Sequence, residues 1–91
     1  MAREPREKPA RLAAKLLHIR RALGLSQTEI LQRMGLETRY VYTIISRNEN
    51  GTREPTLIEL LRYARLAQVP VEVLIDDGLD LPAKFVQNAK S

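Results

Sequence analysis

Gly24 and Gly35 bracket a ten-residue segment, LSQTEILQRM, that has room for one short helix only. Ser26 and Glu29 stand three residues apart at its start, the spacing of a capping box in which each side chain binds a free backbone N–H group. The apolar residues that follow share one face, and glycine ends the helix after about two turns. The segment therefore predicts a helix over Gln27–Met34 with a tight turn at Gly35.

A second short helix is expected after this turn, over about Thr38–Ser46. It would bury Val41, Ile44 and Ile45 and present polar side chains outward. Two short helices joined by a tight glycine turn are typical of a helix-turn-helix, which lays its second helix in the major groove of DNA. The residues expected to be buried together in the core are Leu16, Ile30, Val41, Ile44 and Leu61.

Three further helices are predicted around this pair. Leucine and isoleucine recur at helical spacing from Leu12 to Leu23, which predicts a first helix from Pro9 or Ala10 to Leu23, ended by Gly24 in a left-handed cap. The other predicted elements are a loop over Arg47–Pro55, a helix from the cap residue Thr56 to Ala67 with Glu59 completing a second capping box, and a short helix over Val71–Ile75.

These elements make one all-α domain, a compact bundle of five helices. The 91 residues are enough for a single small core. Four residues are aromatic, three Tyr and one Phe, so we expect the core to consist of Leu, Ile, Val and Ala. The domain is expected over residues 10–78, after a flexible basic arm at 1–9 and before a short tail at 79–91.

Composition excludes several classes of site. The chain has no cysteine and one histidine, so neither a disulfide framework nor a thiolate or histidine metal site is expected. We expect no cofactor and no enzymatic activity, because there is no nucleophile–base pair and no phosphate-cradling glycine loop. No apolar run approaches the ~20 residues that span a bilayer, and the N-terminus lacks the apolar stretch of a signal peptide. The expected location is therefore the cytoplasm.

Positive charge is concentrated at the start of the chain. Residues 1–25 carry seven Lys and Arg against two Glu, a net charge of +5, whereas residues 26–56 carry four of each sign and residues 57–91 carry four against five. Such a basic arm beside a groove-reading motif favours phosphate binding with counterion release. A solubilising tail is the alternative for a charge run of this kind.

The chain carries a series of short motifs in a definite order: Ile19-Arg20, Gly24-Leu25-Ser26-Gln27, Met34-Gly35-Leu36, Tyr40-Val41 with Ile44, Glu49-Asn50-Gly51 with Arg53, Pro55-Thr56, Leu60-Leu61 with Ala64, and Val69, Val71 and Leu74. In this order and spacing, over roughly Leu12–Ile75, the chain resembles the phage lambda repressor and Cro-like proteins, the XRE family. The resemblance implies a lambda-repressor-like fold and a sequence-specific, DNA-binding transcriptional regulator, which we expect to be a repressor.

The resemblance also implies roles for individual residues. Base contacts in the major groove are expected from Thr38, Arg39, Tyr42, Thr43 and Ser46, with Arg39 the strongest candidate because a guanidinium can donate two bonds to guanine. Phosphate contacts are expected from Gln27, Tyr40, Arg47, Asn48 and Arg53. A structural salt bridge is expected between Arg20 at the end of the first helix and Glu49 after the third.

Two departures from the family pattern leave alternatives open. Glu37 stands where the third helix usually has a Ser or Thr cap, so Thr38 is an alternative cap, and capping would take it off the list of base contacts. The segment from Ile44 to Gly51 is about four residues longer than usual. Either the third helix runs an extra turn or the loop after it is longer.

The expected partner is double-stranded DNA, bound by a homodimer at a pseudo-palindromic operator, because one short reading helix gives limited specificity. The alternative is a protein-interaction module of the same fold, such as an antitoxin-like or adaptor partner. Such a module would replace the outward polar residues of the third helix with apolar or acidic ones. Here that face carries Arg39, Thr43 and Ser46, which favours DNA.

Overall fold

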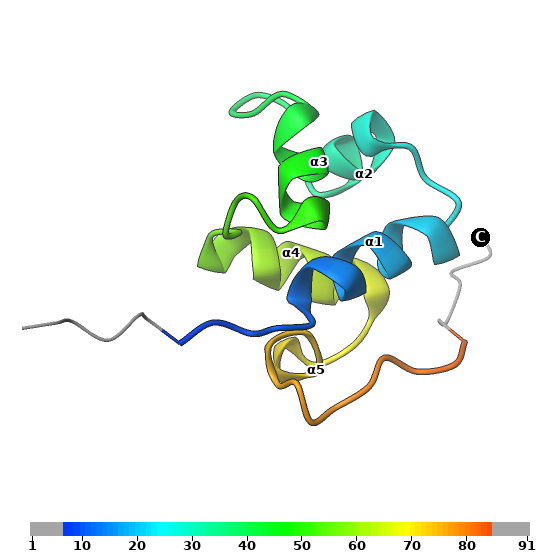
Figure 1. Ribbon diagram of the computed structural model, residues 1–91. Helices are drawn as coiled ribbons and strands as arrows, with labels where there is room; N and C mark the ends of the chain where they lie inside the picture. Colours follow the sequence, from blue (N-terminus) through cyan, green and yellow to red (C-terminus); the bar gives the residue numbers. More distant parts are fainter. Residues whose placement is uncertain (1–6, 85–91) are drawn as a thin grey trace, which may run out of the picture.

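The computed structural model describes residues 7–84, which form five α-helices and no strand (Figure 1). The helices are α1 (Leu12–Ala22), α2 (Gln27–Arg33), α3 (Thr43–Asn50), α4 (Leu57–Ala67) and α5 (Val71–Ile75). Helix α1 packs against α3 on one side and α5 on the other, while α2 rests on α3 and α4 on α5. The all-α fold class is confirmed. Residues 1–6 of the expected arm and 85–91 of the expected tail lie outside the described residues.

The signals around the first two helices act as predicted. Ser26 Oγ accepts from the Glu29 backbone N–H, and Glu29 Oε1 accepts from the Ser26 N–H at 2.7 Å, so the capping box is complete. Gly24 has a φ of +70°, the left-handed conformation that ends α1. Gly35 has a φ of +73°, and the Met34 carbonyl before it accepts from the Arg62 guanidinium on α4.

All five helices contribute side chains to one hydrophobic core. Leu16, Ile19, Ile30, Ile45, Tyr63 and Leu74 have no exposed surface. Tyr63 is the largest of these side chains, so the expectation of a purely aliphatic core is wrong. Burial raises the pKa of the Tyr63 hydroxyl well above its ordinary value, which keeps it neutral.

The predicted bounds and register of the third helix are wrong. Helix α3 begins at Thr43 and ends at Asn50, where Gly51 with a φ of +81° forms a left-handed cap. Its inward positions are Ile45 and Asn48, whereas Val41 precedes the helix and is 65% exposed. Of the expected core, Leu16 and Ile30 are fully buried, and Ile44 and Leu61 are half-buried.

Of the two alternatives left open by the sequence, the extra helical turn is the one observed, because residues 47–50 extend α3 beyond the predicted end at Ser46. The residues before α3 form a separate turn that the sequence did not predict. The Leu36 carbonyl accepts from the N–H groups of Arg39 and Tyr40, which closes a separate turn over residues 36–40. Leu36 is buried and Tyr40 half-buried, so this turn has its own anchors in the core. The third helix therefore starts five residues later than predicted. Tyr42 is its N-cap residue and makes no side-chain capping bond, so neither Glu37 nor Thr38 caps it.

Helix α4 begins with half of the predicted capping box. Thr56 Oγ1 accepts from the Glu59 N–H, but the Glu59 carboxylate turns inward to Arg53 and Asn48. The expected loop over Arg47–Pro55 is wrong in its first half, because residues 47–50 belong to α3.

Residues 76–81 are tied back onto α1. The Asp77 carboxylate accepts from the N–H groups of Ala10 and Arg11, which satisfies free donors at the start of α1. Lys15 is 4% exposed and donates to the carbonyls of Val73, Asp76 and Leu79. The ammonium group of α1 thus binds the C-terminal end of α5 and the chain beyond it.

Candidate nucleic-acid interface

Helix α3 presents a polar stripe to solvent. Because Ile45 and Asn48 point inward, the helical period places Thr43, Ser46, Arg47 and Asn50 on the opposite side. Thr43, Arg47 and Asn50 are exposed and Ser46 is half-buried. The stripe contains one cation and no acid, since the only acidic residue of α3, Glu49, faces α1.

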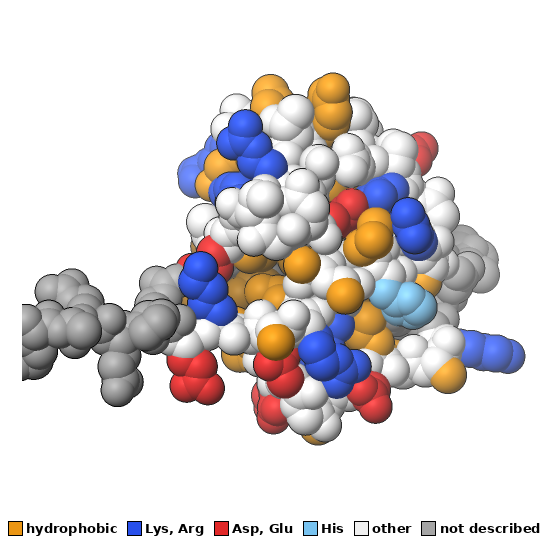
Figure 2. Space-filling view, viewed as in Figure 1, with side chains coloured by type: hydrophobic (Ala, Val, Ile, Leu, Met, Phe, Trp, Pro, Cys, Tyr) orange, Lys and Arg blue, Asp and Glu red, His pale blue; other side chains and the backbone are white. Residues whose placement is uncertain are grey.

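The turn before α3 projects from the body of the domain and extends this surface. Its exposed side chains include Thr38, Arg39, Val41 and Tyr42. Figure 1 places this connection at the top of the molecule, at the free end of α3, and Figure 2 shows hydrophobic and basic side chains adjoining there. Thr38 and Arg39 do not lie on the first turn of α3, as the sequence predicted, but in the preceding turn.

A largely buried ion pair fixes α3 against α1. Arg20 donates to both carboxylate oxygens of Glu49, at 2.6 and 3.0 Å, and to the carbonyl of Leu25. The two side chains are 16% and 5% exposed. The hydrogen bonds to Glu49 raise the pKa of Arg20, although its partial burial acts the other way. This is the salt bridge that the resemblance implies.

Gln27, the first residue of α2, belongs to the same cluster. Its Nε2 lies 3.5 Å from Glu49 Oε1, and the side chain is half-buried. The contact connects the start of α2 to the last turn of α3. Gln27 therefore braces the two helices, and its expected phosphate contact stays a prediction.

A second network engages the side chains of two predicted phosphate ligands, Asn48 and Arg53, with Glu59. Arg53 donates to both oxygens of Glu59, at 2.7 and 2.9 Å, and to Asn48 Oδ1, while Asn48 Nδ2 donates to Glu59 Oε1. Asn48 and Glu59 are each 1% exposed. Burial alone would raise the pKa of Glu59, but the bonds from Arg53 and Asn48 and the positive charge of Arg53 hold it below its ordinary value.

The predicted phosphate contact of Asn48 is wrong, because the side chain is enclosed between α3 and α4. Arg53 is occupied by Glu59, and its guanidinium lies 5.4 Å from the centre of the Tyr40 ring, a cation–π distance. Arg53 and Tyr40 thus hold the projecting turn against the start of α4. Within the predicted phosphate set, Arg47 is the exposed residue on α3.

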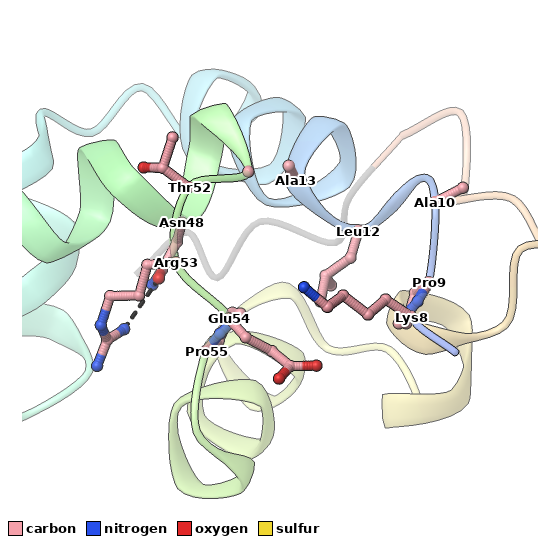
Figure 3. A pocket seen from close by; sticks show the side chains of 11 residues that line it. Lys8, Pro9, Ala10, Leu12, Ala13, Asn48, Thr52, Arg53, Glu54 and Pro55 are labelled. Carbon is pink, nitrogen blue, oxygen red and sulfur yellow. Dashed lines mark hydrogen bonds between the residues drawn. The ribbon is translucent and has the colours of Figure 1, made fainter. Parts of the chain in front are cut away.

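A cavity of about 240 Å³ lies behind this network (Figure 3). It is lined by the residues before and at the start of α1 and by the loop between α3 and α4. Figure 3 shows the Arg53–Asn48 hydrogen bond beside it. Among the residues that line it, Asn48 and Arg53 are hydrogen-bonded to each other, and Lys8, Thr52 and Glu54 contribute further polar side chains.

Hydrophobic patterning could not find the Asn48–Arg53–Glu59 network, since all three residues are polar and would ordinarily face water. The sequence did carry a weak signal for this ion pair. Arg53 and Glu59 have opposite charges and stand six residues apart, on either side of Pro55. The exposed stripe was predicted in part, because Thr43 and Ser46 were assigned to it correctly even with the helix out of place.

The sequence matches no family model, and no curated protein matches it. Within residues 7–84, no helix is long and apolar enough to cross a membrane. The same part of the chain contains no group of three or more His, Asp or Glu residues that could hold a metal ion.

Proposed function

We propose that the protein is a sequence-specific, double-stranded DNA-binding transcriptional regulator that inserts α3 into the major groove. The observation that carries the proposal is the pairing of α2 and α3, with the outward stripe Thr43, Ser46, Arg47 and Asn50 held in place by the Arg20–Glu49 ion pair. We propose that α2 and α3 form a lambda-repressor-like helix-turn-helix with an enlarged turn.

The chemistry of the stripe suits base edges. Arg47 can donate two hydrogen bonds to guanine O6 and N7, and Asn50 lies one turn further along the same face. Because Arg47 is the one cation on α3, it replaces Arg39 as the strongest candidate for a base contact on the helix. Arg39 is exposed on the projecting turn, and we propose that it contacts either a base edge or the DNA backbone.

A phosphate contact is proposed at the start of α2. Gln27 is the first residue of α2, where the helix dipole favours an anion. The basic residues 1–9 add sequence-independent attraction. We further propose that two copies bind a pseudo-palindromic operator and that the protein acts as a cytoplasmic repressor.

Selection of bound sequences from a random pool of duplex DNA, followed by footprinting of the best one, tests this function. A defined consensus and a two-fold symmetric footprint are expected, with affinity falling steeply as salt rises. Arg47→Ala should relax the preference at one base position per half-site. The matched control is Arg65→Ala, which removes the same charge from an exposed site on α4. Failure to enrich any sequence would contradict the proposal.

One observation favours the alternative, a protein-interaction module. Leu57 and Ile58 stand together at the start of α4 and are 82% and 53% exposed. Contiguous apolar surface of this kind is typical of a contact between proteins. If the selection fails and Leu57→Asp abolishes self-association in sedimentation experiments, the domain is an assembly module and not a DNA reader.

A further inference from the structure

The connection between α2 and α3 divides its apolar side chains between the core and solvent. Leu36 is 5% exposed and Tyr40 half-buried, whereas the next two residues, Val41 and Tyr42, are 65% and 52% exposed. The inward pair anchors the turn, and the Arg53 guanidinium covers Tyr40. The outward pair, Val41 and Tyr42, has no such partner in the core. Because these side chains bury little apolar surface, they contribute little to the stability of the fold.

Val41 and Tyr42 immediately precede the first residue of α3. The Val41 carbonyl accepts from the Ile44 N–H and the Tyr42 carbonyl from the Ile45 N–H, so both residues are fixed to the helix by its first hydrogen bonds. In a helix-turn-helix, base edges are contacted by the N-terminal residues of the second helix. The two exposed apolar side chains therefore lie where a groove-reading helix meets the bases.

We infer that Val41 and Tyr42 form an apolar tip that reads the 5-methyl group of thymine in the major groove. This inference rests on the proposed DNA-binding function. The thymine methyl is the one apolar group among the base edges of that groove, and it is read by apolar contact. Val41 is the principal contact, because its branched side chain has few rotamers and loses little freedom when it is covered.

The polar side chains on either side of the tip are compatible with this placement. Arg39 is exposed two residues before Val41, and Thr43 is exposed two residues after it. A cation and a hydroxyl on either side of an apolar tip supply backbone or base contacts while the tip occupies the groove floor. The nearest acid on the turn, Glu37, lies four residues before Val41.

The test replaces single thymines of the selected operator with deoxyuridine, which lacks only the methyl group. Covering one methyl group corresponds to about a fourfold change in Kd. The parent protein should lose about fourfold in affinity at one position per half-site. Val41→Ala should lose about fourfold on the thymine operator and should no longer distinguish thymine from uracil at that position.

Because Val41 is largely exposed, Val41→Ala should melt at the temperature of the parent, which separates binding from folding. Leu57→Ala is the matched control, an exposed aliphatic residue on α4 whose loss should leave the response to deoxyuridine unchanged. A parent protein that binds its operator but ignores every deoxyuridine overturns the inference and leaves the proposed function intact. If the protein enriches no DNA sequence, both the inference and the proposed function are wrong.

A third possible outcome concerns self-association of the free protein. If Val41→Ala weakens dimerisation of the free protein in sedimentation experiments and leaves the deoxyuridine response unchanged, the tip contacts a second copy of the chain and the inference is wrong. Unchanged sedimentation together with lost discrimination of the methyl group supports it.

Discussion

Two ion pairs in this domain have the same shortest N–O distance and should differ greatly in strength. Arg20–Glu49 and Arg11–Asp80 both measure 2.6 Å. The side chains of the first pair are 16% and 5% exposed, and those of the second are 46% and 81% exposed. The burial of each ion pair, and not its N–O distance, should therefore decide how much it contributes to the free energy of unfolding.

Removing one partner of the buried pair leaves a charge without compensation. Such losses typically cost 3–5 kcal/mol, and because Arg20 retains some exposure we expect roughly 3 kcal/mol for Glu49→Ala. In a domain of this size that corresponds to a fall of roughly 12–24 °C in Tm. Exposed pairs are typically worth about 0–1 kcal/mol, so Asp80→Ala should melt within a few degrees of the parent.

A double-mutant cycle at each pair separates the interaction from other effects of the substitutions. Urea unfolding followed by circular dichroism gives the free energies for Arg20→Ala, Glu49→Ala and the double variant, and for Arg11→Ala with Asp80→Ala. We expect a large coupling at the first pair and almost none at the second. Equal couplings would refute the argument that burial of Arg20–Glu49 fixes α3 on α1.

The remaining predictions concern the scaffold. Lys15→Met leaves three backbone carbonyls without their cationic donor and should cost about 2–4 kcal/mol in urea unfolding, whereas Lys84→Met, at an exposed site, should cost little. Because the pKa of Glu59 is lower in the folded protein than in the unfolded chain, its ionised carboxylate stabilises the fold above the unfolded pKa, and this stability is lost as pH falls through the folded pKa. The Glu59→Gln variant should therefore be less stable than the parent at pH 7, and its free energy of unfolding should change less between pH 5 and pH 3. Urea unfolding at each pH measures both effects. Gly51→Ala forces a left-handed alanine at the end of α3 and should lower stability by about 1–2 kcal/mol, measured by thermal melting.

Signals that act over a few residues were readable from the sequence. The capping box of Ser26 and Glu29, the left-handed Gly24 and the bounds of α5 depend on local backbone chemistry, and all are present. The stripe Leu12, Leu16, Ile19 and Leu23 also faces the core: the first three are buried in α1, and Leu23 packs against the core just after the helix.

The register of α3 depended on contacts that no local pattern encodes. The sequence suggested Val41 as an inward residue because it is apolar, yet the inward position is Asn48, whose amide is satisfied by Glu59 and Arg53 from other elements. A buried polar residue with distant partners is indistinguishable from a surface residue in a hydrophobicity pattern. The displaced register moved Thr38 and Arg39 off the helix and brought Arg47 onto its outward stripe.

The central claim, that α3 and the turn before it bind DNA, is tested most directly by nuclear magnetic resonance. Titrating the selected duplex into ¹⁵N-labelled protein reports on every backbone amide at once. We predict that the largest shifts cluster at Gln27 and over residues 38–50, while residues 71–81, on the other side of α1, change little. Shifts confined to the start of α4, with residues 38–50 unaffected, would contradict the account.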